Sequence, residues 1–396
     1  MGSDDQNPFE GMPFFGDMLR MLGNQGPVQW DGARQLALSI ATGGDSEPNI
    51  DPLERIRFEQ LARVADLQVA AATGLSTSTT GQSITVTPVT RTQWVMSTLD
   101  VYRPLVEAMA AALHPPTETG TDASEVEPSG ADPAEAWFGQ IMGLLSPMLL
   151  GMTAGSLVGH LATRSFGSFD LPVPRPPSDE VAVIPANIEP FANDWSMDGD
   201  DLRLWICLHQ ITHHTVLGLP HVHQALTGLL TDYAGAFESD PDSLGSRFAD
   251  LGVEPGSDPM AQFQELLGDP DVLLGAVRSQ RQQEIQPRLQ TLVAAVAGYV
   301  DHVMDSVGSR LIGSYPQITE AMARRRVEAS SSDRFVTRLL GLDLTQDHFD
   351  RGRAFVDGVV ERAGADGLER LWSSAEVLPT PNELVAPGLW LARIDL

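Results

Sequence analysis

The sequence predicts a mainly α-helical protein with a small β component, an α+β class. Apolar residues recur at helical spacing along most of the chain, most clearly over residues 56–69 and 289–307. Alternation typical of a strand is best developed at residues 180–184. With 396 residues, of which 42% are hydrophobic and 20% charged, the chain is long enough to bury a substantial core.

The first part of the chain, residues 1–114, is predicted to be an N-terminal helical region. Helices are expected over residues 30–43, 51–74 and 92–113. Asp51 and Pro52 provide a start signal for the second of these, because Asp caps a helix N-terminus and Pro fits its first turn. Residues 75–90 are rich in Ser, Thr and Gly and are expected to form a loop or a short strand around residues 84–87.

Residues 115–133 are predicted to be an acidic linker or a disordered loop. The segment combines acidic residues with Pro, Gly, Ser and Thr, and Val126 is its only large apolar residue. Such a composition cannot bury enough apolar surface to offset the entropy of ordering the chain. We expect it to separate the N-terminal region from a helical core over residues 134–396.

The helix expected over residues 134–165 contains a nearly uncharged stretch, residues 141–160. Gly151, Gly155 and Gly159 follow one another at intervals of four, a pattern also found in membrane helices that pack closely. Pro147 lies within the stretch, and no basic cluster follows it to set an orientation. We therefore favour a helix buried in a globular core, where the glycines allow a close approach by a neighbour.

A helix over residues 201–217 carries the most informative pattern of the chain. It follows the strand 180–184 and an irregular segment at 187–195, and the carboxylates of residues 198–201 are suited to capping its start. His209 and His213 are four residues apart, so both imidazoles lie on one face, as in the zinc-binding pattern H-E-x-x-H. Gln210 stands where that pattern has its general base, and an amide cannot take up a proton.

Other histidines lie near this pair without sharing its geometry. His214 is turned about 100° from His213 around a helix, so it is not expected to bind the same ion. Gly218 and Pro220 end the helix and place His221 and His223 beyond it. A helix that is largely apolar needs a polar partner for its histidines, which is either a metal ion or a carboxylate.

Charge and cysteine content exclude several classes of function. The net charge is −28 and all 25 basic residues are Arg, so binding to nucleic acid or to a membrane surface is not expected. Residues 324–326, with Arg334 and Arg338, form the only basic cluster and are predicted to pair internally. The single cysteine, Cys207, and a start without a signal-type segment predict a cytoplasmic protein. Nothing in the sequence specifies an oligomeric state.

A family resemblance extends over essentially the whole chain. It is carried by residues 25–31, 47–55, 87–94, 169–172, the histidine helix, and residues 298–305 and 378–383. These segments resemble the zincin-like hydrolases of actinobacteria, which are regarded as zinc-dependent metalloproteases or as proteins associated with deazaflavin coenzyme biosynthesis. The resemblance implies a zincin-like metalloprotease fold in which residues 201–217 form the metal-type helix.

The family patterns are similar to H-E-x-T-H and to E-G-x-x-D-x-V-M-D. Matched to this sequence position by position, they imply which residues occupy the site. The resemblance implies that His209 and His213 are zinc ligands, that Gln210 replaces the base, and that Ala297 replaces the third ligand. Asp301 is then expected beside a ligating histidine as its hydrogen-bond partner. Loss of the base alone removes about 10²–10⁴-fold of rate. Loss of an anionic third ligand also weakens zinc binding, so zinc is expected to be bound weakly or not at all.

Three functions follow from these assignments. The first is a catalytically impaired zincin-fold protein that binds a peptide or protein partner in the cleft that holds the substrate in an active zincin. The alternative is an active zinc-dependent hydrolase with another base and a substituted third ligand from Asp301, His302 or His221. The third is a structural or assembly role, in which the two histidines satisfy one another and Asp301 inside the core.

Overall fold

A computed structural model describes residues 26–113, 133–239, 276–277, 279–327, 331–342 and 344–395. The predicted acidic linker lies, except for Pro133, outside the described residues. The side chains of residues 133–145 are not described either, and neither are those of residues 331–335.

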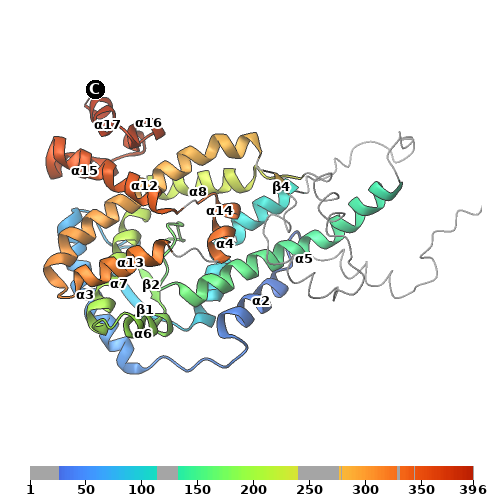
Figure 1. The fold of residues 1–396 in the computed structure, drawn as a ribbon, viewed down its shortest axis with the longest axis horizontal. Helices are drawn as coiled ribbons and strands as arrows, with labels where there is room; N and C mark the ends of the chain where they lie inside the picture. The colour runs from blue at the N-terminus through green and yellow to red at the C-terminus, as the bar shows by residue number, and fades with distance from the viewer. Residues whose placement is uncertain are drawn as a thin grey trace, which may run out of the picture.

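The described chain is mainly helical (Figure 1). Its longer helices are α2 (Trp30–Thr42), α3 (Pro52–Thr73), α4 (Arg91–Leu113), α5 (Pro133–Arg164), α6 (Pro185–Asp194), α7 (Gly199–Leu217), α8 (Pro220–Ala234), α12 (Gln280–Leu311), α13 (Tyr315–Val327), α14 (Ser331–Leu340) and α15 (Gln346–Glu369). The C-terminal part adds the short elements η1 (Arg370–Trp372), η2 (Ala375–Val377), α16 (Pro381–Leu384) and α17 (Pro387–Ile394). The strands are β1 (Thr85–Pro88), β2 (Glu180–Val183), β3 (Glu238–Ser239) and β4 (Ala276–Val277). The predicted class, mainly α with a small β component, is confirmed.

One predicted segment was wrong. Residues 187–195 were expected to be irregular, but residues Pro185–Asp194 form α6. Pro185 occupies the first turn of this helix, where its missing N–H costs nothing and its fixed φ favours helix. A second proline, Pro190, made the segment look broken in the sequence.

The glycines of α5 allow α2 to lie directly against it (Figure 1). A Cβ added at Gly151 would lie 2.5 Å from the carbonyl oxygen of Gln29, and one at Gly155 would lie 2.4 Å from that of Ala33. The expectation of a close approach by a neighbouring helix is confirmed. Among the described residues, no helix combines the length and the apolar character needed to cross a bilayer.

A small sheet positions the segment that faces the histidine helix. β1 and β2 pair in parallel, with Thr85 opposite Glu180 and Pro88 opposite Val183. The other edge of β2 binds residues 166–168, because Ser168 N–H donates to the Ala182 carbonyl at 2.9 Å. These contacts fix the start of the loop that runs from Phe166 towards α7.

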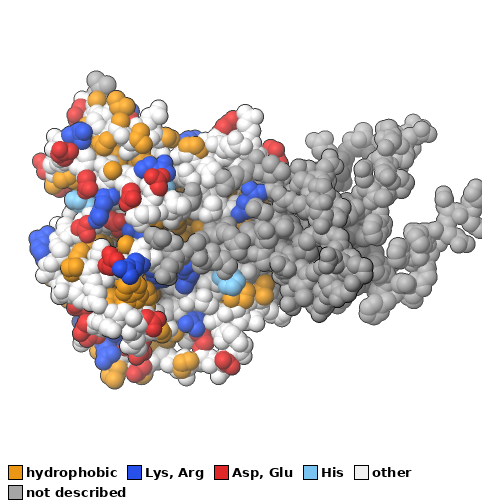
Figure 2. All heavy atoms as spheres, in the orientation of Figure 1, with side chains coloured by type: hydrophobic (Ala, Val, Ile, Leu, Met, Phe, Trp, Pro, Cys, Tyr) orange, Lys and Arg blue, Asp and Glu red, His pale blue; other side chains and the backbone are white. Residues whose placement is uncertain are grey.

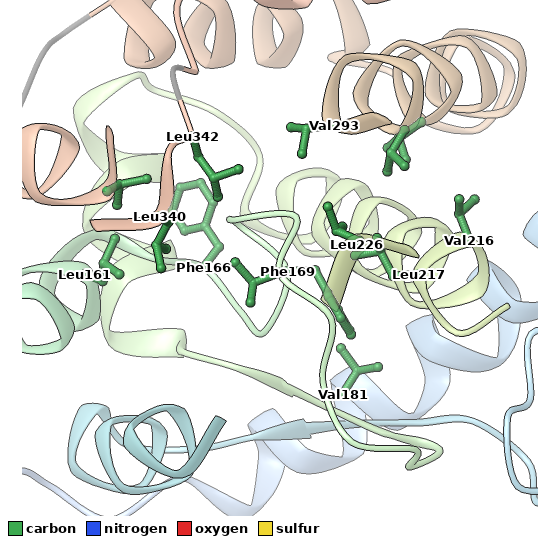
Figure 3. Close-up of a cluster of buried hydrophobic side chains, with 14 of the residues drawn as sticks. Leu161, Phe166, Phe169, Val181, Val216, Leu217, Leu226, Val293, Leu340 and Leu342 are labelled. Atoms are coloured by element: carbon green, nitrogen blue, oxygen red, sulfur yellow. The ribbon is translucent and has the colours of Figure 1, made fainter. Parts of the chain in front are cut away.

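The core gathers side chains from segments far apart in the sequence. Figure 3 shows Phe166 and Phe169 of the loop among Leu161 of α5, Val181 of β2 and Leu226 of α8. On the surface, acidic and Arg side chains are interspersed over the face shown in Figure 2. The loop is therefore part of the core, and its two phenylalanines anchor it beside α7.

Candidate functional site

The histidine helix α7 begins as its sequence predicts. Asp198 is the N-cap, and its side chain accepts hydrogen bonds from Asp200 N–H at 2.8 Å and Asp201 N–H at 3.0 Å. Acidic residues in the first turn also favour the positive end of the helix dipole. The helix ends at Leu217, before Gly218, so His221 and His223 lie on α8, as expected.

His209 and His213 lie side by side on one face of α7. Their ring centroids are 4.4 Å apart, and the Trp205 ring stacks on His209 at 4.8 Å with an interplanar angle of 15°. His213 Nδ1 lies 3.1 Å from the carbonyl oxygen of His209. Because a carbonyl only accepts, Nδ1 carries the proton and Nε2 is left as the basic nitrogen.

Both imidazoles are held in the neutral form. Desolvation is the main cause for each: it lowers the pKa of His209 well below its usual value and that of His213 to about 4. The hydrogen bond to the His209 carbonyl and the charge of Asp301 partly oppose the shift of the His213 pKa. The positive charge of Arg326 lowers the pKa of both histidines further.

His214 points to a different part of the protein, as predicted. Its Nε2 lies 3.8 Å from Asp179 Oδ1, so a carboxylate faces it. Asp179 also accepts hydrogen bonds from residues 78–80 and from Gln82, including those donated by Thr80 Oγ1–H and Gln82 N–H. Several such bonds hold the pKa of Asp179 far below its usual value, despite the opposing effect of burial.

Gln210, at the position of the general base, is fully engaged in structural hydrogen bonds. Its Oε1 accepts from Phe169 N–H at 2.7 Å, and its Nε2 donates to Asp170 Oδ1 at 2.9 Å. The side chain is buried, with 1% exposed. A Cβ at Gly167 would lie 2.7 Å from the Gln210 amide, so glycine is needed there. Gln210 therefore ties α7 to the core loop.

Asp170 accepts hydrogen bonds from several sides. The backbone N–H groups of Phe166 and Gly167 donate to its carboxylate at 2.7 and 3.0 Å, and an Arg325 nitrogen lies 3.6 Å from Oδ2. Burial raises the pKa of Asp170, and these donors together with Gln210 counter the shift. The carboxylate completes the link between the loop, α7 and α13.

The position of the third ligand carries no donor group. Ala297 is buried on α12, with 5% exposed, and presents only a methyl group. Asp301, the predicted hydrogen-bond partner of a ligating histidine, follows one turn later on α12. Both of its carboxylate oxygens accept from Arg326, at 3.0 and 2.9 Å. A guanidinium fork matches a carboxylate better than an imidazole does, because it donates two parallel hydrogen bonds.

The donor set does not fit a zinc ion. A catalytic zinc site needs three protein ligands and one open position. The described residues contain no group of three His, Cys, Asp or Glu side chains placed to hold a metal. Asp301 is bound to a cation, and His221 lies on α8 within electrostatic reach of Glu376. Two imidazoles alone remain of the zinc ligands that the resemblance implies.

A pocket of about 100 Å³ opens beside the histidine pair. It is lined by residues of α7, α12, α13 and α15, with aromatic and methionine side chains next to charged ones. Trp205, which stacks on His209, forms one wall. The other lining residues are Asp301, Met304, Asp305, Tyr315, Thr319, Met322, Ala323, Arg326, Gln346, Phe349, Asp350 and Arg353.

Sequence reasoning found the histidines, Gln210 and Asp301, and missed the residues that these side chains contact. The basic cluster was expected to pair internally, and this is confirmed for Arg325 and Arg326. Their partners, Asp170 and Asp301, lie more than 20 residues away in sequence or on other elements, so no local spacing signals the pairs. Phe349 is brought to the site by helix packing and gave no signal of its own.

The fold and the site together define a helical protein with a zincin-type histidine pair and, in the part of the chain that the structure describes, without a third side chain placed to hold the metal. The chain belongs to the family of zincin-like metallopeptidases, whose sequence profile matches residues 28–391.

One solved structure is similar over nearly the full length. It is the crystal structure of a protein from Chloroflexus aurantiacus that is described as a candidate hydrolase with a novel fold. The identity is 23%, the TM-score is 0.61, and the alignment covers 93% of this chain and 99% of the other. At that identity the likeness shows the fold alone. No curated protein is significantly similar to the chain.

Proposed function

We propose that this protein is a zincin-fold protein without peptidase activity, which binds a peptide or protein segment in the pocket beside the histidine pair. The observation that carries the proposal is the state of Gln210. Its amide oxygen and amide nitrogen are both used to hold the core loop, at 2.7 and 2.9 Å. No group at that position is free to accept a proton from a water molecule.

Metal content and chelation test whether the protein lacks a bound zinc ion, and a casein assay tests whether it lacks peptidase activity. We expect far less than one zinc per chain in protein purified without a histidine tag, because two imidazoles bind zinc weakly without a third ligand. The melting temperature should be unchanged by EDTA, and unfolded casein should not be cleaved. One zinc per chain, together with casein cleavage that His213→Ala abolishes, would falsify the proposal.

The alternative, an active zinc-dependent hydrolase, is favoured by one observation. Both imidazoles are adjacent and neutral, and His213 Nε2 is unprotonated, which is the state that a metal ligand requires. This function needs a third ligand and a base from outside the positions described. The same measurements separate the two functions, because a chelator-sensitive melt belongs only to the alternative.

The chemistry of the pocket indicates which peptides it accepts. Its lining contains three carboxylates, Asp301, Asp305 and Asp350, and two guanidinium groups, Arg326 and Arg353, a surplus of one negative charge. The whole chain carries a net charge of −28, which attracts cations over a long range. Aromatic and methionine walls suit the aliphatic stem of a basic side chain.

We therefore expect a preference for peptides with a basic residue. Three fluorescein-labelled peptide pools that differ only in a central Arg, Leu or Asp should bind in that order, measured by fluorescence polarisation. Asp350→Asn should weaken binding of the Arg pool by about 2- to 5-fold, since one exposed charge pair contributes up to about 1 kcal/mol. Asp366→Asn, an exposed change on the same helix outside the pocket, is the control. Tighter binding of the Asp pool would contradict the assignment.

A further inference from the structure

Helix α3 carries apolar side chains on two opposite faces. The inward face packs into the core, and its side chains, which are at most 2% exposed, are those of Phe58, Ala62, Ala65 and Val69. The outward face carries four large apolar side chains, which are 42% to 71% exposed: Leu53, Ile56, Val64 and Leu67. They are half of the eight large apolar side chains that are exposed in the described part of the chain. Single exposed apolar residues are ordinary, but such a cluster indicates an interaction surface.

The outward side chains form a straight stripe along α3. At about 100° per residue, they all fall within about 80° of the circumference of the helix, on the side opposite the buried face. Gln60 and Ala71, which are exposed as well, fall within the same arc. The α3 stripe therefore consists of Leu53, Ile56, Gln60, Val64, Leu67 and Ala71, and it is about 27 Å long. Its spacing of three and four residues is typical of a helix that packs lengthwise against another helix.

The charge of α3 favours a second copy of the chain as the partner. The three Arg and three acidic residues of this helix cancel, whereas the whole chain carries a net charge of −28. Two copies of so acidic a protein repel one another, and they do so least where the local charge is zero. A basic partner would be attracted to the acidic surface elsewhere and would gain little from this neutral helix.

The α3 stripe is complementary to itself when two copies run antiparallel. A two-fold axis through the middle of the stripe, near residue 62, places Ile56 of each copy opposite Leu67 of the other. It also places Gln60 of each copy opposite Val64 of the other. Such an arrangement buries the large apolar side chains of both copies in one seam and closes after two chains.

The charged residues beside the stripe agree with the same arrangement. Arg63 pairs with Glu59 of its own helix, and both side chains are more than half exposed. In the antiparallel pair, each Arg63 lies lengthwise between the Glu59 of its own helix and the Glu59 of the second copy. The two acids and the two arginines therefore form one network at the centre of the contact.

We propose that α3 is a homodimer interface, in which two copies of the chain pack their α3 stripes antiparallel about a two-fold axis. The inference is independent of the proposed function, because no residue of the α3 stripe lines the pocket. A single pair of helices is a small interface, so we expect a reversible dimer with a dissociation constant of about 10 µM.

Sedimentation velocity on the full chain, from about 1 to about 300 µM, tests the association. Leu67→Glu places a charge against Ile56 of the second copy and should weaken the dimer by at least about ten-fold. Leu389→Glu is the matched control, because Leu389 lies on α17 and is 58% exposed. This control should dimerise as the natural protein does. Circular dichroism shows whether each variant is folded.

An exchange of charges tests the arrangement. Arg63→Glu brings four carboxylates together at the centre of the contact and should weaken the dimer, whereas Arg63→Glu combined with Glu59→Arg restores the pairing and should restore the dimer. Cysteines supply a second test, because Cys207 is buried. Proteins with Gln60→Cys and with Val64→Cys, mixed and oxidised, should form the mixed disulfide in preference to either disulfide of like with like.

The result can fail in three ways. A chain that stays monomeric at about 300 µM would overturn the inference and leave the α3 stripe to a different protein. A dimer that persists unchanged in a folded Leu67→Glu variant would place the interface elsewhere. Disulfides that form mainly between like cysteines, with no recovery in the charge-exchanged variant, would overturn the antiparallel arrangement. None of these results would bear on peptide binding beside the histidine pair.

Discussion

Replacing Gly298 by alanine is expected to destabilise the protein by about 3 kcal/mol or more, since small-to-large changes against a fixed backbone leave no room to adjust. A Cβ at Gly298 would lie 2.2 Å from the carbonyl carbon and oxygen of Gly352 on α15. A Cβ at Gly352 would in turn lie 2.0 Å from the carbonyl oxygen of Ala294. Both helices would have to move apart. Urea unfolding followed by circular dichroism measures the loss.

Gly228→Ala is the matched control, because that glycine lies on α8 with nothing within 4 Å of an added Cβ. Alanine in an open helix position is expected to stabilise by up to about 1 kcal/mol. Gly352→Ala should behave as Gly298→Ala does. If Gly298→Ala unfolded at the same urea concentration as Gly228→Ala, the close crossing of α12 and α15 would be refuted.

The crossing also matters for the site. α12 carries Ala297 and Asp301, and α15 carries Phe349, Asp350 and Arg353 of the pocket. Separation of the two helices would therefore widen the pocket as well as weaken the core. Peptide binding should fall in Gly298→Ala even at temperatures where the protein remains folded.

Gln210→Glu is expected to cost about 2–4 kcal/mol at neutral pH and to restore no peptidase activity. The change puts a carboxylate oxygen in place of Nε2, which lies 2.9 Å from Asp170 Oδ1. Two carboxylates at that distance repel, so the folded protein raises the pKa of the pair. The cost is absent below the usual carboxyl pKa of about 4 and complete above the raised value in the folded protein. Thermal unfolding at pH 5 and pH 7.5 should show the larger deficit at pH 7.5.

A second substitution tests the same hydrogen bond from the other side. Asp170→Asn in the Gln210→Glu background supplies an amide donor to the new carboxylate, so about 2 kcal/mol should return. The single change Asp170→Asn removes the charge that faces Arg325 and replaces one acceptor oxygen, which receives N–H donors, by a donor, so it should cost about 1–3 kcal/mol. A Gln210→Glu protein that was as stable as the natural one and cleaved casein with zinc would favour the active hydrolase instead.

The helices and the histidine pair follow from local sequence. The spacing of His209 and His213 places both rings on one face of any helix, and the caps and prolines mark where the helices begin. The small residues of α5 predict a close neighbour because only backbone geometry is involved. These features depend on residues within a few positions of one another, so one sequence is enough to predict them.

The hydrogen-bond partners of the site residues depend on tertiary structure alone. Gln210 cannot act as a base in any surroundings, because an amide takes up no proton. Its role in holding the core loop arises only because Phe169 and Asp170 lie against it, and that placement depends on strand pairing far away in the chain. Asp301 meets Arg326 because α13 packs across α12, a contact between residues 25 positions apart. Sequence determined that two imidazoles face one way. The fold determined that Asp301, on a neighbouring helix, binds the guanidinium of Arg326, because side-chain pairing between helices depends on their packing and not on local spacing.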